Sequence, residues 1–247
     1  MERVAAPRRV ALAAWAAFLA IAAVAWSLIF VQAASPAMPQ MMPLPAFLAF
    51  WVVMMVAMMF PSVAPTAILW SRGIMRTTSG LERALRMAGF ASGYLLAWAA
   101  FGLAAYWTIV HLAALIARSP QSAGWIGAGI FMFAALYQVS PLKRACLLHC
   151  RSPFAALMHY AGFPERGRDV LVGVHHGAYC VGCCWGLMAL LLAAGVMNVP
   201  AMAVVAALIF LEKRWSRGER LATWLSVGFL ALAVVAARNP GAFPGLH

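Results

Sequence analysis

Three cysteines and two histidines lie close together in an apolar stretch, LVGVHHGAYCVGCCWGLM, between residues 171 and 188. On a helix, four side chains of this stretch recur every fourth residue and share one face: His176, Cys180, Cys184 and Met188. Thiolates, imidazoles and thioethers are ligands that soft and borderline metal ions accept. The pattern predicts a metal site with Cys180, Cys183 and Cys184 as thiolate ligands. His175 and His176 would add an imidazole ligand or orient the others.

A second cluster of metal-binding residue types, Cys146, His149 and Cys150, precedes this stretch. The two cysteines are four residues apart, so on a helix both thiols and the imidazole can converge on one Zn(II) or Cu(I) ion. A fourth ligand would come from elsewhere in the chain. The alternative is an amphipathic helix whose cysteines only pack against their neighbours.

Methionine thioethers are concentrated in the segment MMVAMM, where Met54 and Met58 form one row and Met55 and Met59 form a parallel row. Three more methionines, at positions 38, 41 and 42, precede this segment. Together with the thiolates, these thioethers would form a graded path for Cu(I), which prefers soft ligands. The alternative is that the methionines fill gaps in an apolar core.

The composition places the chain among integral membrane proteins, because 65% of its 247 residues are hydrophobic and 10% are charged, with a mean hydropathy of +0.88. The formal net charge of +12 would suit a nucleic-acid partner if the basic residues shared one face. They lie instead in short segments between apolar runs, which is typical of loops that set membrane topology. We therefore expect a lipid bilayer as partner, and no nucleic acid.

We predict one all-α domain, residues 1–247, that forms a polytopic membrane bundle of about seven transmembrane helices. The predicted spans cover residues 10–33, 46–70, 87–117, 122–140, 170–192, 199–214 and 221–237. With the N-terminus in the cytoplasm, every Lys and Arg except Arg118 and Arg238 falls on the cytoplasmic side, as the positive-inside rule requires. This topology puts loop 141–169 in the cytoplasm and the cysteines at 180–184 near the middle of the membrane. Four glycines of that span, at 173, 177, 182 and 186, would let neighbouring helices approach closely.

Three segments carry a resemblance to a known family: MMVAMMFPS, YQVSPLKRACLLHCRSP and GVHHGAYCVGCCWGLMALLLAAGVMN, followed by Glu212 and Lys213. They resemble a bacterial family of predicted metal-binding integral membrane proteins, a domain of unknown function. The resemblance extends from about residue 54 to residue 220. It implies metal binding and no particular reaction.

Together these observations predict a multi-pass protein of the bacterial inner (plasma) membrane that handles a transition metal ion, with copper favoured and zinc as the alternative. A metal-donor or metal-acceptor protein would exchange the ion with it. The chain has only six acidic residues and no Ser-His-Asp signature or Walker loop, which favours a non-enzymatic role. Two other functions stay open: a membrane thiol-disulfide oxidoreductase that uses Cys180 and Cys183 as a C-x-x-C pair, and a non-catalytic assembly subunit of a membrane complex.

Overall fold

The computed structural model describes residues 2–33, 42–74, 78, 80–119, 122–152, 158–160, 162 and 167–243. In chain order, its helices are α1 (Glu2–Ala33), α2 (Leu44–Ile74), α3 (Gly80–Arg118), α4 (Ser122–Gln138), α5 (Pro141–Arg151), α7 (Arg168–Ala194), α8 (Val199–Arg214), α9 (Gly218–Arg238) and the short 3-10 helix η2 (Pro240–Ala242). No strand occurs among the described residues, so the predicted all-α class is confirmed.

Each predicted span coincides with a helix, and α1 and α3 begin several residues before the predicted starts. The segment 141–169, predicted as a loop, contains the helix α5, because Ser140 accepts a hydrogen bond from the amide of Lys143 and Pro141 occupies the first turn. Met38 and Met41 lie outside the described residues.

Five helices of the described chain are long and apolar enough to cross a membrane: α1, α2, α3, α7 and α9. The pair α4 and α5 passes the same test together, but it is bent by 61°, so it is a broken span or a re-entrant loop. Helix α8 has 16 residues, fewer than the roughly 20 that usually cross a bilayer. The structure thus supports five to six candidate spans, and the count of seven and the orientation remain predictions.

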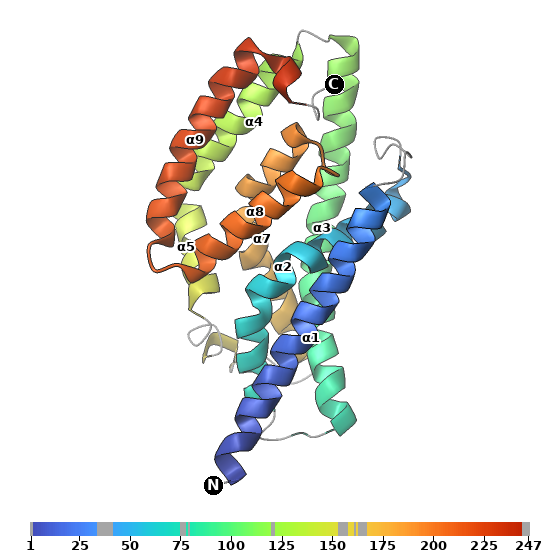
Figure 1. The fold of residues 1–247 in the computed structure, drawn as a ribbon, viewed down its shortest axis with the longest axis vertical. Helices are drawn as coiled ribbons and strands as arrows, with labels where there is room; N and C mark the ends of the chain where they lie inside the picture. The colour runs from blue at the N-terminus through green and yellow to red at the C-terminus, as the bar shows by residue number, and fades with distance from the viewer. Residues whose placement is uncertain are drawn as a thin grey trace.

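Helix α7 lies inside the bundle and packs against α3, α5, α4 and α8 (Figure 1). Helices α4 and α9 run side by side along one flank, and α1 packs on α2 on the other (Figure 1). Helix α7 ends at Ala194 and is followed by Gly195, whose φ of 91° is accessible to glycine; Asn198 then caps the start of α8 by accepting from the amide of Ala201. This tight turn returns the chain along α7 and brings the far end of α8 back to the level of the cysteines.

Candidate metal centre

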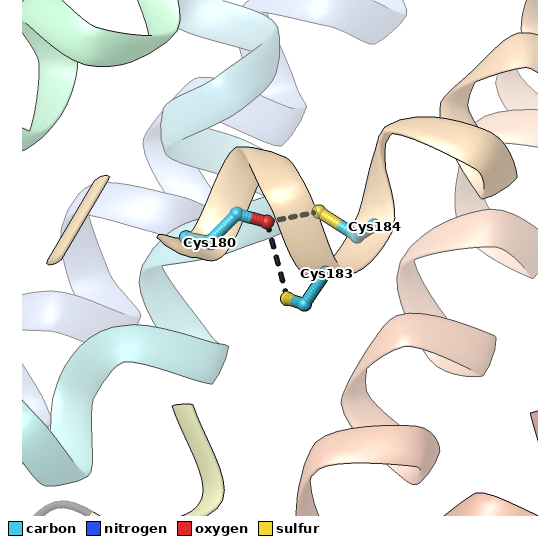
Figure 2. Close-up of side chains that lie close together, drawn as sticks. All are labelled: Cys180, Cys183 and Cys184. Carbon is cyan, nitrogen blue, oxygen red and sulfur yellow. Dashed lines mark hydrogen bonds between the residues drawn. The ribbon is translucent and has the colours of Figure 1, made fainter. Parts of the chain in front are cut away.

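The three cysteines of α7 bring their sulfur atoms within 4.8 Å of one another. The spacing follows from the helix, since residues three and four positions apart share a face. The thiols of Cys183 and Cys184 both donate to the main-chain carbonyl of Cys180, at 3.1 and 2.9 Å (Figure 2). Each cysteine is 1% exposed. The group, called the thiol centre below, therefore offers three clustered sulfur ligands shielded from bulk water.

The four predicted glycines of α7 face three different neighbours. Gly173 and Gly177 face α3, and a Cβ atom on Gly173 would lie only 2.1 Å from the carbonyl oxygen of Phe90. Gly182 faces a cysteine of α5, and Gly186 faces a tyrosine ring of α4. The predicted close approach of neighbouring helices is confirmed, and it places polar groups of those helices next to the thiol centre.

Cys180 is contacted by polar groups from two other helices. The hydroxyl of Tyr94 on α3 lies 2.9 Å from its sulfur atom. The ammonium group of Lys213 on α8 donates to the same sulfur atom at 3.0 Å and to the hydroxyl of Ser62 on α2 at 3.2 Å. Lys213 is 7% exposed, so the thiol centre contains a buried positive charge. Lys213 is not among the predicted site residues, and its only signal in the sequence is the Glu212 and Lys213 pair within the family resemblance.

Helix α5 brings the second cysteine cluster against α7. A Cβ atom on Gly182 would lie 2.7 Å from the sulfur atom of Cys146, and the Cys150 thiol interacts with that of Cys183. His149, between these cysteines, lies with its ring stacked on that of Tyr179 at a centroid distance of 3.9 Å. The structure therefore places the thiols of α5 against α7 near the thiol centre, but outside the group of three sulfur atoms that lie within 4.8 Å of one another.

A buried ion pair holds α5 in this position. The ammonium group of Lys143 donates to the carboxylate of Glu212 on α8 at 2.8 and 3.0 Å, and both side chains are almost fully buried. Gln138 completes the network, because its amide oxygen accepts from Lys143 and its amide nitrogen donates to Glu212. A buried charge pair is tolerated only when its remaining polar groups are also satisfied, as they are here.

Two histidine side chains contact the hydroxyl group of Tyr160, and a third histidine packs against one of them. The Nε2 atom of His149 lies 2.9 Å from the hydroxyl oxygen, and the Nδ1 atom of His175 lies 3.4 Å from it. His159 stacks on His175 at a centroid distance of 5.2 Å. Burial, with the neighbouring His175 and His159, lowers the pKa of His149 below its ordinary value, so this imidazole is neutral at neutral pH. Burial also raises the pKa of Tyr160, which keeps its phenol protonated.

His176 lies between this histidine group and the thiol centre. Its ring centroid is 6.0 Å from that of His149, and Cys180 follows one helical turn later. It is 3% exposed, and its Nδ1 atom has no hydrogen-bond partner among the residues that the structure describes. An unsatisfied buried nitrogen is costly in an apolar interior, so a ligand for this atom would be stabilising. The three thiols fit a soft metal ion, whereas the nitrogens of His176 lie outside the group of ligand atoms that are within 4.8 Å of one another.

The four predicted methionine ligands are buried in the core, at 0–3% exposure: Met54, Met55, Met58 and Met59. Met55 and Met58 lie on the same face of α2 as Ser62, which contacts Lys213. Within the described residues, no hydrogen bond joins these sulfur atoms to the cysteines. The structure thus directs part of the methionine surface toward the thiol centre and leaves a ligand role for it as a prediction.

Helices that enclose three buried thiols define an all-helical protein with a site suited to a soft metal ion. The chain belongs to the PpoB2 family, described as copper chaperone, whose model matches residues 48–236. The match extends from α2 into α9 and includes the thiol centre and all the histidines around it. The match confirms the prediction that the chain is related to copper-handling proteins. The family is a copper-related one, not the predicted family of membrane proteins of unknown function. No curated protein and no solved structure matches the chain.

Proposed function

We propose that the protein is a membrane-embedded copper chaperone that binds Cu(I) through the thiolates of Cys180, Cys183 and Cys184. The observation that carries this proposal is the three buried sulfur atoms within 4.8 Å of one another. Cu(I) selects thiolate and thioether ligands over oxygen ligands, and the clustered donors are all sulfur. The copper description of the family supports the choice of metal.

The buried positive charge of Lys213 also suits a metal ion held by thiolates. Three thiolates and one Cu(I) ion carry a net charge of −2, and the Lys213 ammonium group, 3.0 Å from the Cys180 sulfur atom, reduces it to −1 within the apolar bundle. Zn(II) with three thiolates carries a net charge of −1, which the same ammonium group balances, so zinc is the alternative cargo. Structural zinc sites are almost always four-coordinate, which would require a further ligand from Cys150 or His176.

The remaining predicted ligands form the approaches to the thiol centre. Cys146 and Cys150 provide thiols beside Gly182 and Cys183, through which the ion can be exchanged between α5 and α7. The methionines of α2 guide the ion on the opposite side, since thioethers bind Cu(I) weakly enough to release it. A donor or acceptor protein exchanges the ion at the α5 side.

The chain spans the bacterial inner membrane seven times with its N-terminus in the cytoplasm. The five to six candidate spans and the distribution of basic residues support this topology. In it, the short helix α8 reaches the cytoplasmic surface through its exposed terminal residue Arg214, and α4 crosses with α5 at its cytoplasmic end. A reporter enzyme that is active only outside the cytoplasm, fused to the C-terminus, should be active, and one fused to the N-terminus should be inactive. The reverse result would overturn the orientation.

Copper binding is tested on the reduced protein in detergent, titrated anaerobically with Cu(I) against a chromophoric chelator and, in parallel, with Zn(II). We expect about one tightly held Cu(I) per chain, with sulfur ligands in X-ray absorption spectra. The variant Cys180→Ser/Cys183→Ser/Cys184→Ser should lose this tight binding while it keeps the helical content and the elution volume of the wild-type protein. Equal Cu(I) affinity in the two proteins would refute the proposal. A reversible loss of two titratable thiols, without metal binding, would instead favour the thiol-disulfide oxidoreductase.

A further inference from the structure

A cavity of about 300 Å³ lies at the corner of the bundle where the end of α4, the start of α5 and the start of α9 meet (Figure 1). It contains no cysteine or histidine and is therefore separate from the thiol centre. Its volume is at the lower end of the range for small-molecule sites, about 300–1,000 Å³. The lining includes the basic side chains of Lys143, Arg144 and Arg220 and the hydroxyl groups of Ser140 and Thr223. Such a lining suits an anionic ligand group.

Two of the three basic groups of this cavity are already paired with carboxylates. The ammonium group of Lys143 lies 2.8 Å from the carboxylate of Glu212, and the guanidinium group of Arg144 lies 3.2 Å from that of Glu219. Within the described part of the chain, the guanidinium group of Arg220 makes no hydrogen bond or ion pair. The cavity therefore carries one unbalanced positive charge, which matches a ligand group with a single negative charge.

Exposed apolar side chains continue from the cavity along both flanking helices. Val139 lines the cavity, and Leu136 precedes it by one turn on the same face of α4. On α9, Val227 follows the lining residue Thr223 by one turn on the same face. The three apolar side chains are each more than half exposed. In the proposed topology, the cavity lies at the cytoplasmic surface of the membrane and both helices run from it into the bilayer, so these side chains face acyl chains.

We infer that this cavity binds the phosphate group of an anionic phospholipid, with Arg220 as the main contact and the acyl chains along the exposed faces of α4 and α9. The inference rests on the proposed membrane embedding of the chain and not on its copper cargo. A phosphodiester carries one negative charge, and a guanidinium group can bind two of its oxygen atoms at once. Basic pockets between membrane helices on the cytoplasmic side are typical sites for anionic headgroups. Inorganic phosphate offers the same oxygen atoms without acyl chains, so the apolar faces favour the lipid.

The first test measures lipid binding to the full-length protein in detergent by native mass spectrometry, with phosphatidylglycerol and phosphatidylcholine as the added lipids. We expect phosphatidylglycerol to bind more tightly, because the headgroup of phosphatidylcholine has no net charge. Arg220→Gln should weaken the binding of phosphatidylglycerol about 10-fold, since a charge-assisted hydrogen bond is lost. Arg214→Gln is the matched control, because it removes an equally exposed arginine at the end of α8 that does not line the cavity. Equal affinity for the two lipids, or equal losses in the two variants, would overturn the inference.

The second test separates the lipid from free phosphate and this site from the proposed function. Phosphatidylglycerol, but not inorganic phosphate, should raise the melting temperature of the wild-type protein, and Arg220→Gln should abolish the rise. An equal rise with inorganic phosphate would overturn the assignment to a lipid. The variant Cys180→Ser/Cys183→Ser/Cys184→Ser should bind phosphatidylglycerol as the wild-type protein does, so a failure of copper binding leaves the lipid site standing. Recovery of the chain in the soluble fraction without detergent would overturn both the membrane embedding and the lipid site.

Discussion

The contact between α3 and α7 leaves no room for a side chain at Gly173. A Cβ atom at this position would lie 2.1 Å from the carbonyl oxygen of Phe90 and 2.8 Å from the amide nitrogen of Tyr94. The reciprocal position on α3, Gly93, is equally close to α7, with 2.1 Å to the carbonyl oxygen of Val170. Because the atoms in the way are backbone atoms, Gly173→Ala can be accommodated only if the two helices separate. Ordinary contact begins near 3.4 Å, so the required shift is about 1.3 Å.

Two measurable consequences follow from this separation. Overpacking costs about 1–3 kcal/mol, which for a chain of this size lowers the apparent melting temperature by about 2–12 °C. The same shift moves Tyr94, whose hydroxyl is 2.9 Å from the Cys180 sulfur atom, to about 4 Å, beyond hydrogen-bonding range. We therefore expect Gly173→Ala to melt earlier in detergent and to bind Cu(I) more weakly than the wild-type protein.

Gly228→Ala is the matched control for this prediction. A Cβ atom on Gly228 of α9 meets no atom of the described part of the chain within 4 Å, and alanine is the better helix former. Its melting temperature and Cu(I) affinity should match or slightly exceed those of the wild-type protein. If Gly173→Ala behaves like this control in both assays, the backbone contact of α3 and α7 does not position the thiol centre, and the reasoning is refuted.

Three further substitutions test the polar contacts of the bundle. Glu212→Gln leaves the ammonium group of Lys143 buried without its counter-charge and should destabilise the protein by about 3–5 kcal/mol. The loss should appear as a lower melting temperature in detergent, and an unchanged melting temperature would contradict the role of the ion pair. Asp169→Asn should lower the free energy of unfolding by less than about 1 kcal/mol, because Arg86 and Asp169 are partly exposed and the new amide oxygen can still accept from Trp70. A loss of stability as large as that of Glu212→Gln would show that this ion pair contributes more than its exposure indicates. Lys213→Met should lower Cu(I) affinity by about 10- to 100-fold, because a charged hydrogen bond to the metal-bound sulfur atom is lost. The stability of the metal-free protein should not fall. A lysine with a purely structural role would give the opposite result, a loss of stability with unchanged Cu(I) affinity.

Most of the helical framework could be predicted from the sequence. Apolar runs bounded by charged or turn residues mark the helices from α1 to α9, and the four glycines of α7 identify it as a helix with close neighbours. The three thiols of the thiol centre were also predictable, because residues three and four positions apart on a helix share a face. These features depend on local spacing, which a sequence states directly.

The rest of the centre depends on how distant segments pack, which local spacing does not determine. His159 lies in the connection between α5 and α7, outside both predicted cysteine motifs, so nothing in the sequence connects it with His149 and His175. Lys213 looked like an ordinary basic residue at the end of a short span until the structure placed its ammonium group on Cys180. Both residues became visible only when three-dimensional contacts joined separate parts of the chain.

The end of α8 explains why two cysteine motifs, separated along the chain, converge on one centre. Adjacent residues on a helix point about 100° apart, so Glu212 and Lys213 serve two different neighbours. Glu212 pairs with Lys143 and fixes α5, while Lys213 reaches Cys180 on α7. One turn of α8 thus fixes the position of the α5 motif that holds Cys146 and Cys150, and it supplies the positive charge beside the thiol centre of α7. A change at Glu212 should therefore also disturb Cu(I) binding, although its carboxylate pairs with Lys143 rather than with any cysteine of the thiol centre.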